Sequence, residues 1–537
     1  MKKILWLVSV VGLLSGCQLL SSESRPVPPE ELPEYTQEAG IERYALIHPG
    51  AQPAPMIDRQ LPAQLQADLW DRIRLQMALD IPEHELIESH RDWYLRHPAY
   101  IDRITQRAAP FLHLIVEEIE KRDLPLELVL VPVVESAYDT FAYSHGRASG
   151  IWQFIPSTAR HYGLGIDWWY DGRRDVMAAT TTALDYFDRL ATLFDGDWLL
   201  AMAAYNGGQG RVMNAVRRNE REGKPTDFWS LSLPRETRNY VPKILALSEL
   251  LRDSEDWNVV WPHIPNQRVT DIVDVGQQID LALAAEMAGM TLEELHRYNS
   301  GYNRWATAPD GPHTLLLPVE RANQFRAALA ETDPSDWLAW QRHQVRSGES
   351  LSTIAQRYNT TTQTIQQFND INGSLIRQGD YLLIPVASQA LERYTLSAEQ
   401  RLAAAQDRPQ GQQKIEHRVQ RGDTFWDLSR QYNVSINNLA RWNNMAPGDM
   451  LRPGQTLAVW QGTPNTQTVS ISNTSASTPV MRTVHYQVRS GDSLALIASR
   501  FRVRISDIER WNSISRERYL QPGQKLTLHV DVTKVTL

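Results

Sequence analysis

The sequence predicts a multidomain α+β protein, in which a mainly helical domain precedes several small modules of the order strand, helix, helix, strand (βααβ). The chain has 537 residues, which is more than one hydrophobic core usually supports. Apolar residues recur at three- and four-residue spacing in the first half, as helices require. The second half contains three similar segments, which indicates repeated small domains.

Composition and charge narrow the possible partners. The net charge of −8 and the pI near 6.0 lack the basic character expected of a nucleic-acid binder, so no nucleic acid is expected. The 17 Trp and 19 Tyr side chains offer flat faces that can stack on sugars. The 14 His residues include no HExxH pair and no Cys/His cluster, so neither a metal nor a cofactor is expected. Carbohydrate is therefore the favoured polymer.

The N-terminus predicts a secretory signal over residues 1–16. Lys2 and Lys3 precede an apolar run that is too short to cross a bilayer as a mature helix. The following "LSGC" resembles a bacterial lipoprotein cleavage box, which implies cleavage before Cys17 and lipidation of that residue. Gln18 in place of Asp implies, by the same resemblance, the outer membrane facing the periplasm. The alternative is an ordinary signal peptide with an incidental cysteine.

Residues 17–64 are rich in Ser, Pro and Glu and predict an extended tether. Residues 65–265 predict the helical domain, with helical spacing in stretches such as "YIDRITQRAAPFLHLIVEEIEKRDLP". A degenerate βααβ copy is expected over 269–320, either as a binding module or as a structural bridge without a binding surface.

Three further units, 341–386, 415–460 and 484–530, align without gaps over their first halves. In each unit a glycine is followed after 21 residues by an asparagine; the pairs are Gly348 and Asn369, Gly422 and Asn443, and Gly491 and Asn512. Residues 387–414 predict a helix-prone linker, and residues 461–482 predict a Ser/Thr-rich linker.

The three units resemble LysM domains, which are βααβ modules that hold N-acetylglucosamine-containing glycans. By motif, the resemblance implies glycan-binding positions in the loop before the first helix and in the opposite loop. These are Gly348, Glu349, Ser350, Leu351 and Ile376, then Gly422, Asp423, Thr424, Phe425 and Leu451, then Gly491, Asp492, Ser493, Leu494 and Leu520. The three asparagines, with Trp442 and Trp511, are expected to be packing and turn residues.

The helical domain carries the motifs "ESAY", "GIWQF", "AYNGG" and "ETRNYV" in this order. Together they resemble the soluble-lytic-transglycosylase-like family, which implies a lysozyme-type fold, a catalytic Glu135 and peptidoglycan as substrate. Ile151, Trp152 and Gly208 depart from the usual motif residues but leave the polar side chains in place. The valines of segment 126–135 favour a strand, whereas the resemblance implies a buried helix interrupted or bent near Pro132.

Glu135 follows an apolar run, and apolar surroundings raise the pKa of a carboxyl group so that it can protonate a departing sugar oxygen. A second carboxylate would be needed for ordinary glycoside hydrolysis. The nearby acids Asp139, Asp167, Asp171 and Asp175 are expected to be exposed loop acids or helix caps. The family resemblance instead implies attack by the C6 hydroxyl of N-acetylmuramic acid, which leaves a 1,6-anhydro end.

By the same resemblance, Ser136 and Gln153 would bind substrate or orient Glu135, while Tyr205 and Asn206 would hold the reacting sugar. Tyr240 would support the acid or the developing positive charge. Trp152, Trp168 and Trp169 could stack on sugars, although buried packing is their more frequent use. The alternatives are a hydrolytic muramidase on the same scaffold and a noncatalytic wall-binding lipoprotein.

Overall fold

The structure, a computed structural model, describes a defined set of residues: 59–144, 146–461, 481–488, 494–501, 503, 505–514, 520–521 and 523–531. The predictions for the signal peptide, Cys17, most of the tether and most of linker 461–482 lie outside the described residues. The same holds for Gly491, Asp492 and Ser493. By its contacts the chain divides into two compact units, Met1–Thr463 and Pro464–Leu537.

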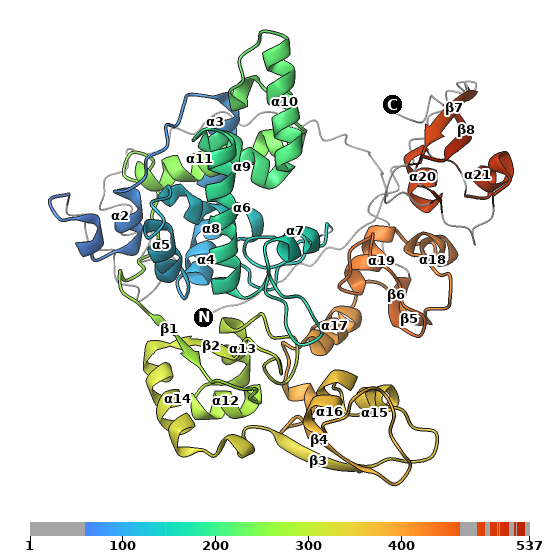
Figure 1. Cartoon of the computed structure of the whole chain (residues 1–537). Coiled ribbons are helices and arrows are strands. Elements are labelled where there is room, and N and C mark those ends of the chain that lie inside the picture. The colour runs from blue at the N-terminus through green and yellow to red at the C-terminus, as the bar shows by residue number, and fades with distance from the viewer. Residues whose placement is uncertain are drawn as a thin grey trace, which may run out of the picture. The chain divides into compact units, whose positions relative to one another are not determined.

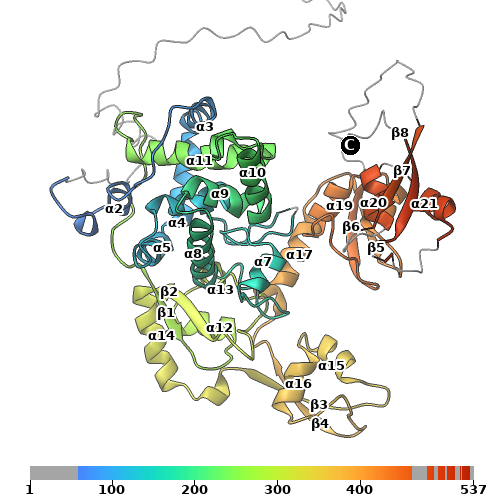
Figure 2. The ribbon, with the colours of Figure 1, turned by 45° about the horizontal axis from the view of Figure 1, so that its top comes forward.

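The first part of unit 1 is a helical domain (Figure 1). Its helices are α2 Leu69–Arg74, α3 Glu85–Leu95, α4 Pro98–Ala108, α5 Leu112–Glu120, α6 Val131–Ser136, α7 Pro156–His161, α8 Val176–Leu193, α9 Trp198–Gly207, α10 Gln209–Arg221 and α11 Arg235–Arg252, with short 3₁₀ turns Ala63–Leu65, Leu126–Leu130 and Phe228–Ser230. Helix α8 contacts α5 on one side and α9 on the other, as Figures 1 and 2 both show. The apolar side chains of these helices form one core.

Local sequence explains where the long central helices begin. Asp175 caps α8 by accepting a hydrogen bond from Ala178 N, and Asp197 caps α9 by accepting one from Leu200 N. Each carboxylate pairs a backbone N–H that the first helical turn leaves free. Segment 126–135, which the sequence left open between strand and helix, is a 3₁₀ turn followed by α6.

Among the residues that the structure describes, four βααβ units follow the helical domain, three in unit 1 and one in unit 2. Their elements are β1 Thr270–Asp274, α12 Leu281–Met287, α13 Leu292–Tyr298 and β2 Thr314–Pro318; β3 Ala339–Gln344, α15 Leu351–Arg357, α16 Thr362–Phe368 and β4 Tyr381–Val386; β5 Gln413–Arg418, α18 Phe425–Gln431, α19 Ile436–Trp442 and β6 Thr456–Gln461; and β7 Met481–Gln487, α20 Leu494–Phe501, α21 Ile505–Asn512 and β8 Lys525–Asp531. In each unit the two strands pair antiparallel.

One asparagine at the end of the second helix joins helix to strand in every unit. In the third unit, Asn443 Nδ2 donates to Leu439 O and Ala458 O at 2.8 and 2.9 Å, and Ala458 N donates back to Oδ1 at 2.7 Å. Asn299, Asn369 and Asn512 repeat this arrangement. Because buried backbone groups must be paired, the asparagine fixes the closing strand against the helix. The expectation that the repeated asparagines and Trp442 have packing and turn roles is therefore confirmed.

The first βααβ unit is extended by α14 Val319–Glu331 and by a turn at Pro334–Asp336. Its Asp280 is fully buried, caps α12 and accepts hydrogen bonds from Tyr394 Oη at 2.9 and 3.0 Å and from Ser388 N at 2.8 Å. Segment 387–414, predicted as a linker, thus packs against this unit through the 3₁₀ turn Leu391–Arg393, and it continues into α17 Ala398–Asp407.

The predicted fold class is confirmed: the protein is a multidomain α+β chain with a mainly helical domain and small paired-strand modules. Within the described residues, no helix combines the length and the apolar character needed to cross a membrane.

Candidate active site

Glu135 lies in the last turn of a short, buried helix. The residues before it, Leu126 to Val133, are buried, and Pro132 occupies the first turn of α6, where its missing N–H costs no hydrogen bond. The chain leaves α6 at Ala137 in the left-handed conformation, with φ 50°. The acid therefore sits where an apolar helix ends and a polar loop begins.

A tyrosine from α11 contacts the acid directly. Tyr240 Oη donates a hydrogen bond to Glu135 Oε1 at 2.7 Å. Loss of hydration in the apolar surroundings raises the pKa of the Glu135 carboxyl from 4.5 to about 7. The Tyr240 hydrogen bond and the Lys243 ammonium lower that pKa, whereas the nearby Glu236 carboxylate raises it further. The carboxyl can therefore hold a proton near neutral pH and can also release it.

Two adjoining cavities share Glu135, and together they form the cleft. The main cavity has a volume of about 730 Å³ and the side cavity about 410 Å³. Both are lined by Val134, Glu135, Ser144 and Gln153. Because the acid lies where the cavities meet, a chain-like ligand can pass it with units bound on either side.

The five residues predicted to accompany Glu135 all line the cleft: Gln153, Tyr205, Asn206 and Tyr240 in the main cavity, and Ser136 in the side cavity. Gln153 has a left-handed backbone with φ 51°, and its Nε2 donates to Gly150 O at 2.8 Å. Tyr205 Oη donates to Trp152 O at 2.8 Å. All five side chains thus lie at the cleft, while their functional roles stay predictions.

Two of these side chains make contacts that the sequence did not indicate. Ser136 Oγ lies 3.1 Å from Pro132 O and 3.0 Å from Ile151 O, so it ties the end of α6 to the next loop instead of bonding the Glu135 carboxyl. Asn206 Oδ1 accepts a hydrogen bond from Thr237 Oγ1 at 3.0 Å, which leaves its amide N–H groups as the available donors.

None of the four nearby aspartates is among the described residues that line the cleft. Asp175 caps α8, and Asp167 Oδ1 accepts from Trp169 N and Tyr170 N. Asp139 accepts from Phe141 N in a turn. These roles agree with the expectation of caps and loop acids. Asp171 is not an exposed acid, however, because it is buried in an ion pair with Arg173.

The cleft residues that the sequence analysis did not single out include Tyr100, Tyr186, Glu236 and Lys243. Glu236, Tyr240 and Lys243 recur at spacings of four and three on α11, so helical periodicity around the late tyrosine motif could have indicated two of them. Tyr100 and Tyr186 come from α4 and α8, where no motif marks them.

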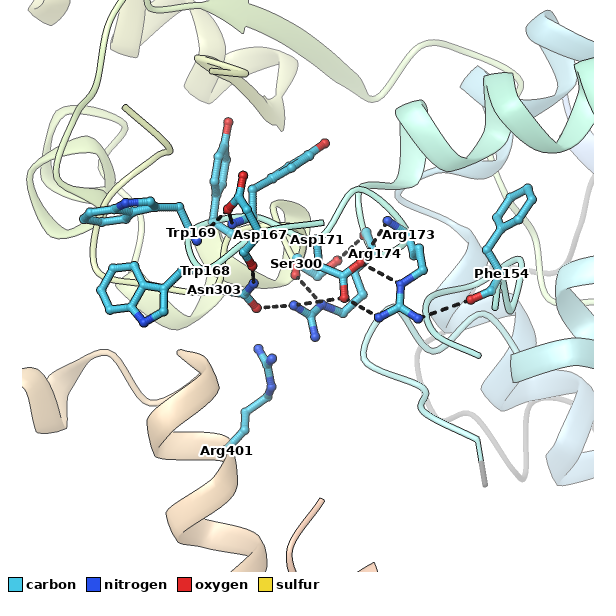
Figure 3. A network of polar contacts seen from close by, with 12 residues as sticks. Phe154, Asp167, Trp168, Trp169, Asp171, Arg173, Arg174, Ser300, Asn303 and Arg401 are labelled. Atoms are coloured by element: carbon cyan, nitrogen blue, oxygen red, sulfur yellow. Dashed lines mark hydrogen bonds and ion pairs between the residues drawn. The ribbon is translucent and has the colours of Figure 1, made fainter. Parts of the chain in front are cut away.

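A polar network reaches Phe154, one of the residues that line the main cavity (Figure 3). Arg173 is held by Asp171 at 2.8 and 2.7 Å, and its Nη1 donates to Arg147 O at 2.7 Å and to Phe154 O at 3.4 Å. A side chain at Gly150 would place Cβ 1.8 Å from Arg173 O, so the glycine permits this close approach. The network thus fixes the loop that presents Gln153.

The same network reaches the first βααβ unit. Asp171 N donates to Gly301 O at 2.8 Å, Arg174 Nε donates to Ser300 O at 3.1 Å, and Ser300 Oγ donates back to Arg174 O at 2.6 Å. Arg174 also bonds Asn303 Oδ1. The cleft wall and the first βααβ unit therefore share one buried set of hydrogen bonds.

The predicted LysM glycan-binding residues divide into two groups. The side chains of Leu351, Phe425 and Leu451 lie in their module cores, which corrects the expectation that they meet glycan. Ile376 and Leu520 pack partly against their cores, as does Leu494. Such apolar side chains hold the loops in shape and leave the loop backbone as the exposed surface.

The polar members of these loops are also engaged within the module. Ser350 and Thr424 cap α15 and α18. Glu349 and Asp423 each accept hydrogen bonds from a histidine ring and from a backbone N–H, with His343 and His417 as the partners at 2.8 Å. Gly348 and Gly422 have φ values of 81° and 100°, which the tight loop requires.

Within the described residues, no group of three or more His, Cys, Asp or Glu side chains is arranged to hold a metal ion.

Comparison with known families assigns the parts of the chain. Residues 114–228 match the transglycosylase SLT domain, and residues 269–333 match the LysM-like domain of the lytic transglycosylase MltD. Residues 343–385, 417–460 and 486–528 match the LysM domain.

The sequence similarity to a lytic transglycosylase covers most of the chain, whereas the similarity to two solved structures covers less than half of it. The membrane-bound lytic murein transglycosylase D of Escherichia coli strain K12 is 40% identical over 398 residues, which are 72% of this chain and 85% of that protein. Among solved structures, the 70 kDa soluble lytic transglycosylase of Escherichia coli is 18% identical, with a TM-score of 0.25, and covers 40% of each chain. The lytic transglycosylase Slt of Pseudomonas aeruginosa is 18% identical, with a TM-score of 0.24, and covers 42% of each chain.

The raised pKa of Glu135 predicts a pH-dependent gain in stability for Glu135→Gln. In the unfolded chain the carboxyl ionises near its ordinary pKa of 4.5, whereas in the folded protein it ionises near 7. The folded wild type therefore loses stability as the pH rises from 4.5 to 7, because the unfolded state releases its proton first. Glu135→Gln should raise the free energy of unfolding of the helical domain at pH 8 by on the order of 1–3 kcal/mol. This gain is smaller than the full pKa shift would give, because solvent in the open cleft screens the charge.

Peptide-resolved hydrogen exchange at pH 8, and chemical denaturation at pH 8 and near pH 4.5, measure this effect in the full chain. The matched control is Glu236→Gln, which neutralises an exposed carboxylate of the same cleft and should change stability by less than about 0.5 kcal/mol. An equal gain from Glu135→Gln at both pH values would contradict the assignment of a raised pKa to Glu135.

Proposed function

The chain belongs to the membrane-bound lytic murein transglycosylase D family, and from this premise we propose that Glu135 is its catalytic acid and base. The enzyme is a peptidoglycan lytic transglycosylase. We infer that it cleaves the β-1,4 bond between N-acetylmuramic acid and N-acetylglucosamine. The observation that carries the residue assignment is a single carboxyl with a pKa of about 7, bonded to Tyr240, at the meeting point of the two cavities.

In the first step, Glu135 donates its proton to the glycosidic oxygen while the bond from C1 of N-acetylmuramic acid to that oxygen breaks. A pKa of about 7 leaves a large fraction of the carboxyl protonated at neutral pH, whereas a pKa of 4.5 would leave less than about 1%. Burial thus supplies the acid form, and the departing N-acetylglucosamine leaves with a neutral hydroxyl.

In the second step, the C6 hydroxyl of the same N-acetylmuramic acid attacks C1, and its proton passes to the Glu135 carboxylate. The bond between O6 and C1 closes the 1,6-anhydro ring, and no water is consumed. Glu135 returns to its protonated form, so one carboxyl completes the cycle. Tyr240 Oη, which donates to Glu135 Oε1, stabilises the carboxylate formed between the two steps.

The other cleft residues have positioning roles in this scheme. Asn206, whose Oδ1 is engaged by Thr237, would donate through Nδ2 to an acetamido carbonyl. Gln153 lines both cavities, and Tyr205 is stacked on Phe187 with ring centroids 4.4 Å apart. Ser136 anchors the end of α6 to the loop at Ile151 and thereby sets the direction of the acid.

The LysM units would hold the enzyme on its polymer. We propose that the exposed backbone of the first loops at Gly348 and Gly422 binds glycan. Several weak sites on one chain raise the local substrate concentration even when each binds poorly.

We further propose that Cys17 carries a lipid anchor that places the enzyme at the outer membrane, facing the periplasm. The support is the "LSGC" sequence and the membership of a membrane-bound family.

Product analysis tests the proposed reaction. Digestion of purified sacculi should release muropeptides with 1,6-anhydro ends, which are lighter by one water than the corresponding reducing products. Glu135→Gln should lower turnover by at least about 100-fold, because the general acid and base is lost. Asp139→Asn, which keeps the turn acceptor, is the control and should retain activity. Reducing-end products would indicate hydrolysis and would contradict the proposed reaction.

The pH profile tests the role of Tyr240. The Tyr240 hydrogen bond lowers the pKa of Glu135, so Tyr240→Phe should raise that pKa. Activity that needs the protonated acid would then persist to higher pH, and the alkaline limb of kcat/KM should move up by about one unit while kcat falls. Tyr205→Phe removes a hydroxyl that bonds backbone instead and should leave the limb in place. An unmoved limb in Tyr240→Phe would rule out this coupling.

Cell fractionation tests the anchor. In a Gram-negative host, the wild type should sediment with outer membranes, and Cys17→Ala should lose the lipid and fail to be anchored there. Mass analysis of the mature N-terminus shows whether the lipid is present. Wild-type protein that lacks lipid would contradict the proposed lipidation while leaving the proposed reaction intact.

A further inference from the structure

The surface that the LysM resemblance assigns to glycan differs between the βααβ units. Ser350 and Thr424, which cap the first helix of the second and third units, are exposed. Asp280 caps the first helix of the first unit at the matching position and is fully buried. In the opposite loop, residues 305–308 of the first unit are at most 2% exposed, whereas Met450 of the third unit is 85% exposed. The first unit therefore does not offer this surface to solvent.

Hydrogen bonds between the two loops close the groove of the first unit. Thr307 N donates to Ile279 O at 3.0 Å, and Ile279 N donates to Thr307 Oγ1 at 3.0 Å. Among the described residues, no hydrogen bond joins residues 348–351 to residues 372–378, which are the corresponding loops of the second unit. A glycan that entered the first unit would have to separate buried groups that are already paired.

Segment 387–407 of the same chain covers the closed groove. Tyr394 Oη donates to the Asp280 carboxylate, with 2.9 and 3.0 Å to its two oxygens, and Ser388 N donates to Asp280 Oδ2 at 2.8 Å. Tyr394 is 1% exposed and belongs to the same buried cluster as Trp305 of the opposite loop. Tyr394 and Trp305 also line one small cavity of about 40 Å³. The segment thus reaches both loops of the groove.

The groups that this segment presents to Asp280 are a hydroxyl and an amide N–H, which are also the donors of an N-acetylated sugar. A buried carboxylate needs such donors to offset its lost hydration. Burial raises the pKa of Asp280, whereas the hydrogen bonds from Ser388 and Tyr394 lower that pKa. The segment therefore stabilises the carboxylate, and no glycan is needed to complete its hydrogen bonds.

The middle of the segment contacts both the first unit and the helical domain. Ala398 N, at the start of α17, donates to Asn303 O at 2.8 Å. The Arg401 guanidinium lies 4.7 Å from the centroid of the Phe141 ring, and Figure 3 shows this side chain directed toward the buried network. The first turns of α17 are thus held against the catalytic body.

The far end of α17 contacts the third unit. Gln406 Nε2 donates to Asn443 Oδ1 at 2.8 Å and to Thr456 O at 3.1 Å. Trp460 Nε1 donates back to Gln406 O at 3.2 Å. Asn443 is the residue that fixes the closing strand of this unit, so α17 is bonded to the centre of the module.

We propose that segment 387–407 is an intramolecular strap, and that the groove of the first βααβ unit binds this strap in place of glycan. One end of the strap fills the groove, and the other end holds the third unit through Gln406. Glycan binding in unit 1 is then left to the second and third units, whose loops are exposed. This last point rests on the proposed function, whereas the docking of the strap does not.

Peptide-resolved hydrogen exchange of the full chain tests the docking. Tyr394→Phe removes the hydroxyl that bonds Asp280 and keeps the ring in its buried cluster. Residues 388–397 should then exchange at least about tenfold faster than in the wild type, because a buried carboxylate loses a donor. Tyr432→Phe is the matched control, since its hydroxyl bonds His417 within the third unit, and it should leave this exchange unchanged. Unchanged exchange in Tyr394→Phe would overturn the proposal.

Asp280→Asn provides a second variant. The asparagine keeps one oxygen that can cap α12, but its NH₂ group cannot accept a hydrogen bond from Ser388 N. Residues 388–397 should therefore lose protection while α12 stays protected. Equal loss of protection in α12 and in residues 388–397 would show that Asp280 only maintains the unit, and would reject the strap as a separable ligand of the groove.

Hydrogen exchange with an excess of the N-acetylglucosamine tetramer tests the exclusion of glycan. The tetramer should slow exchange at residues 420–425 of the third unit and leave residues 388–397 unchanged. A sugar that entered the first unit would have to displace the strap, so faster exchange of residues 388–397 with the tetramer would overturn the proposal. Lack of any protection at residues 420–425 would instead count against the proposed glycan binding by this LysM unit, and the result for Tyr394→Phe would still decide the docking of the strap.

Discussion

The protonation of the acid in the cleft depends on one interaction, the hydrogen bond from Tyr240 to Glu135 at the end of an apolar helix. Burial alone favours the neutral acid, and the tyrosine alone favours the carboxylate. Their balance brings the pKa to about 7, where both forms are accessible. The apolar run before α6 excludes water from the Glu135 carboxyl, and the long helix α11 places the Tyr240 hydroxyl against it.

Much of this organisation could be predicted from the sequence. The repeated glycine and asparagine positions predicted the βααβ units because their spacing is set within one small module, as the Asn443 bonds illustrate. Glu135 could be found because the apolar-to-polar boundary that raises its pKa is local in sequence. The helical state of segment 126–135 could not be decided, because a continuous apolar run fits a buried helix and a buried strand equally well.

The contacts that the sequence could not indicate are those between distant segments. Leu351 and Phe425 stand in the motif positions expected to meet glycan, yet they fill module cores, since a short loop needs apolar anchors below it. Asp171 pairs with Arg173 in the interior, and Glu236 reaches the cleft from α11. Sequence position records neither the direction of a side chain nor the neighbour that it meets after folding.

The hydrogen bonds of Arg173 and Arg174 indicate that the residues that support the cleft extend beyond the helical domain. A chain that ended after Trp261 would retain every residue of the cleft, but it would lose Ser300 and Asn303, which hold the loop behind Gln153. The first βααβ unit is therefore part of the catalytic body, despite its likeness to a binding module. A module that resembles a binding domain can thus support a cleft, and the residues at its interface are then constrained by the position of the loop that carries Gln153.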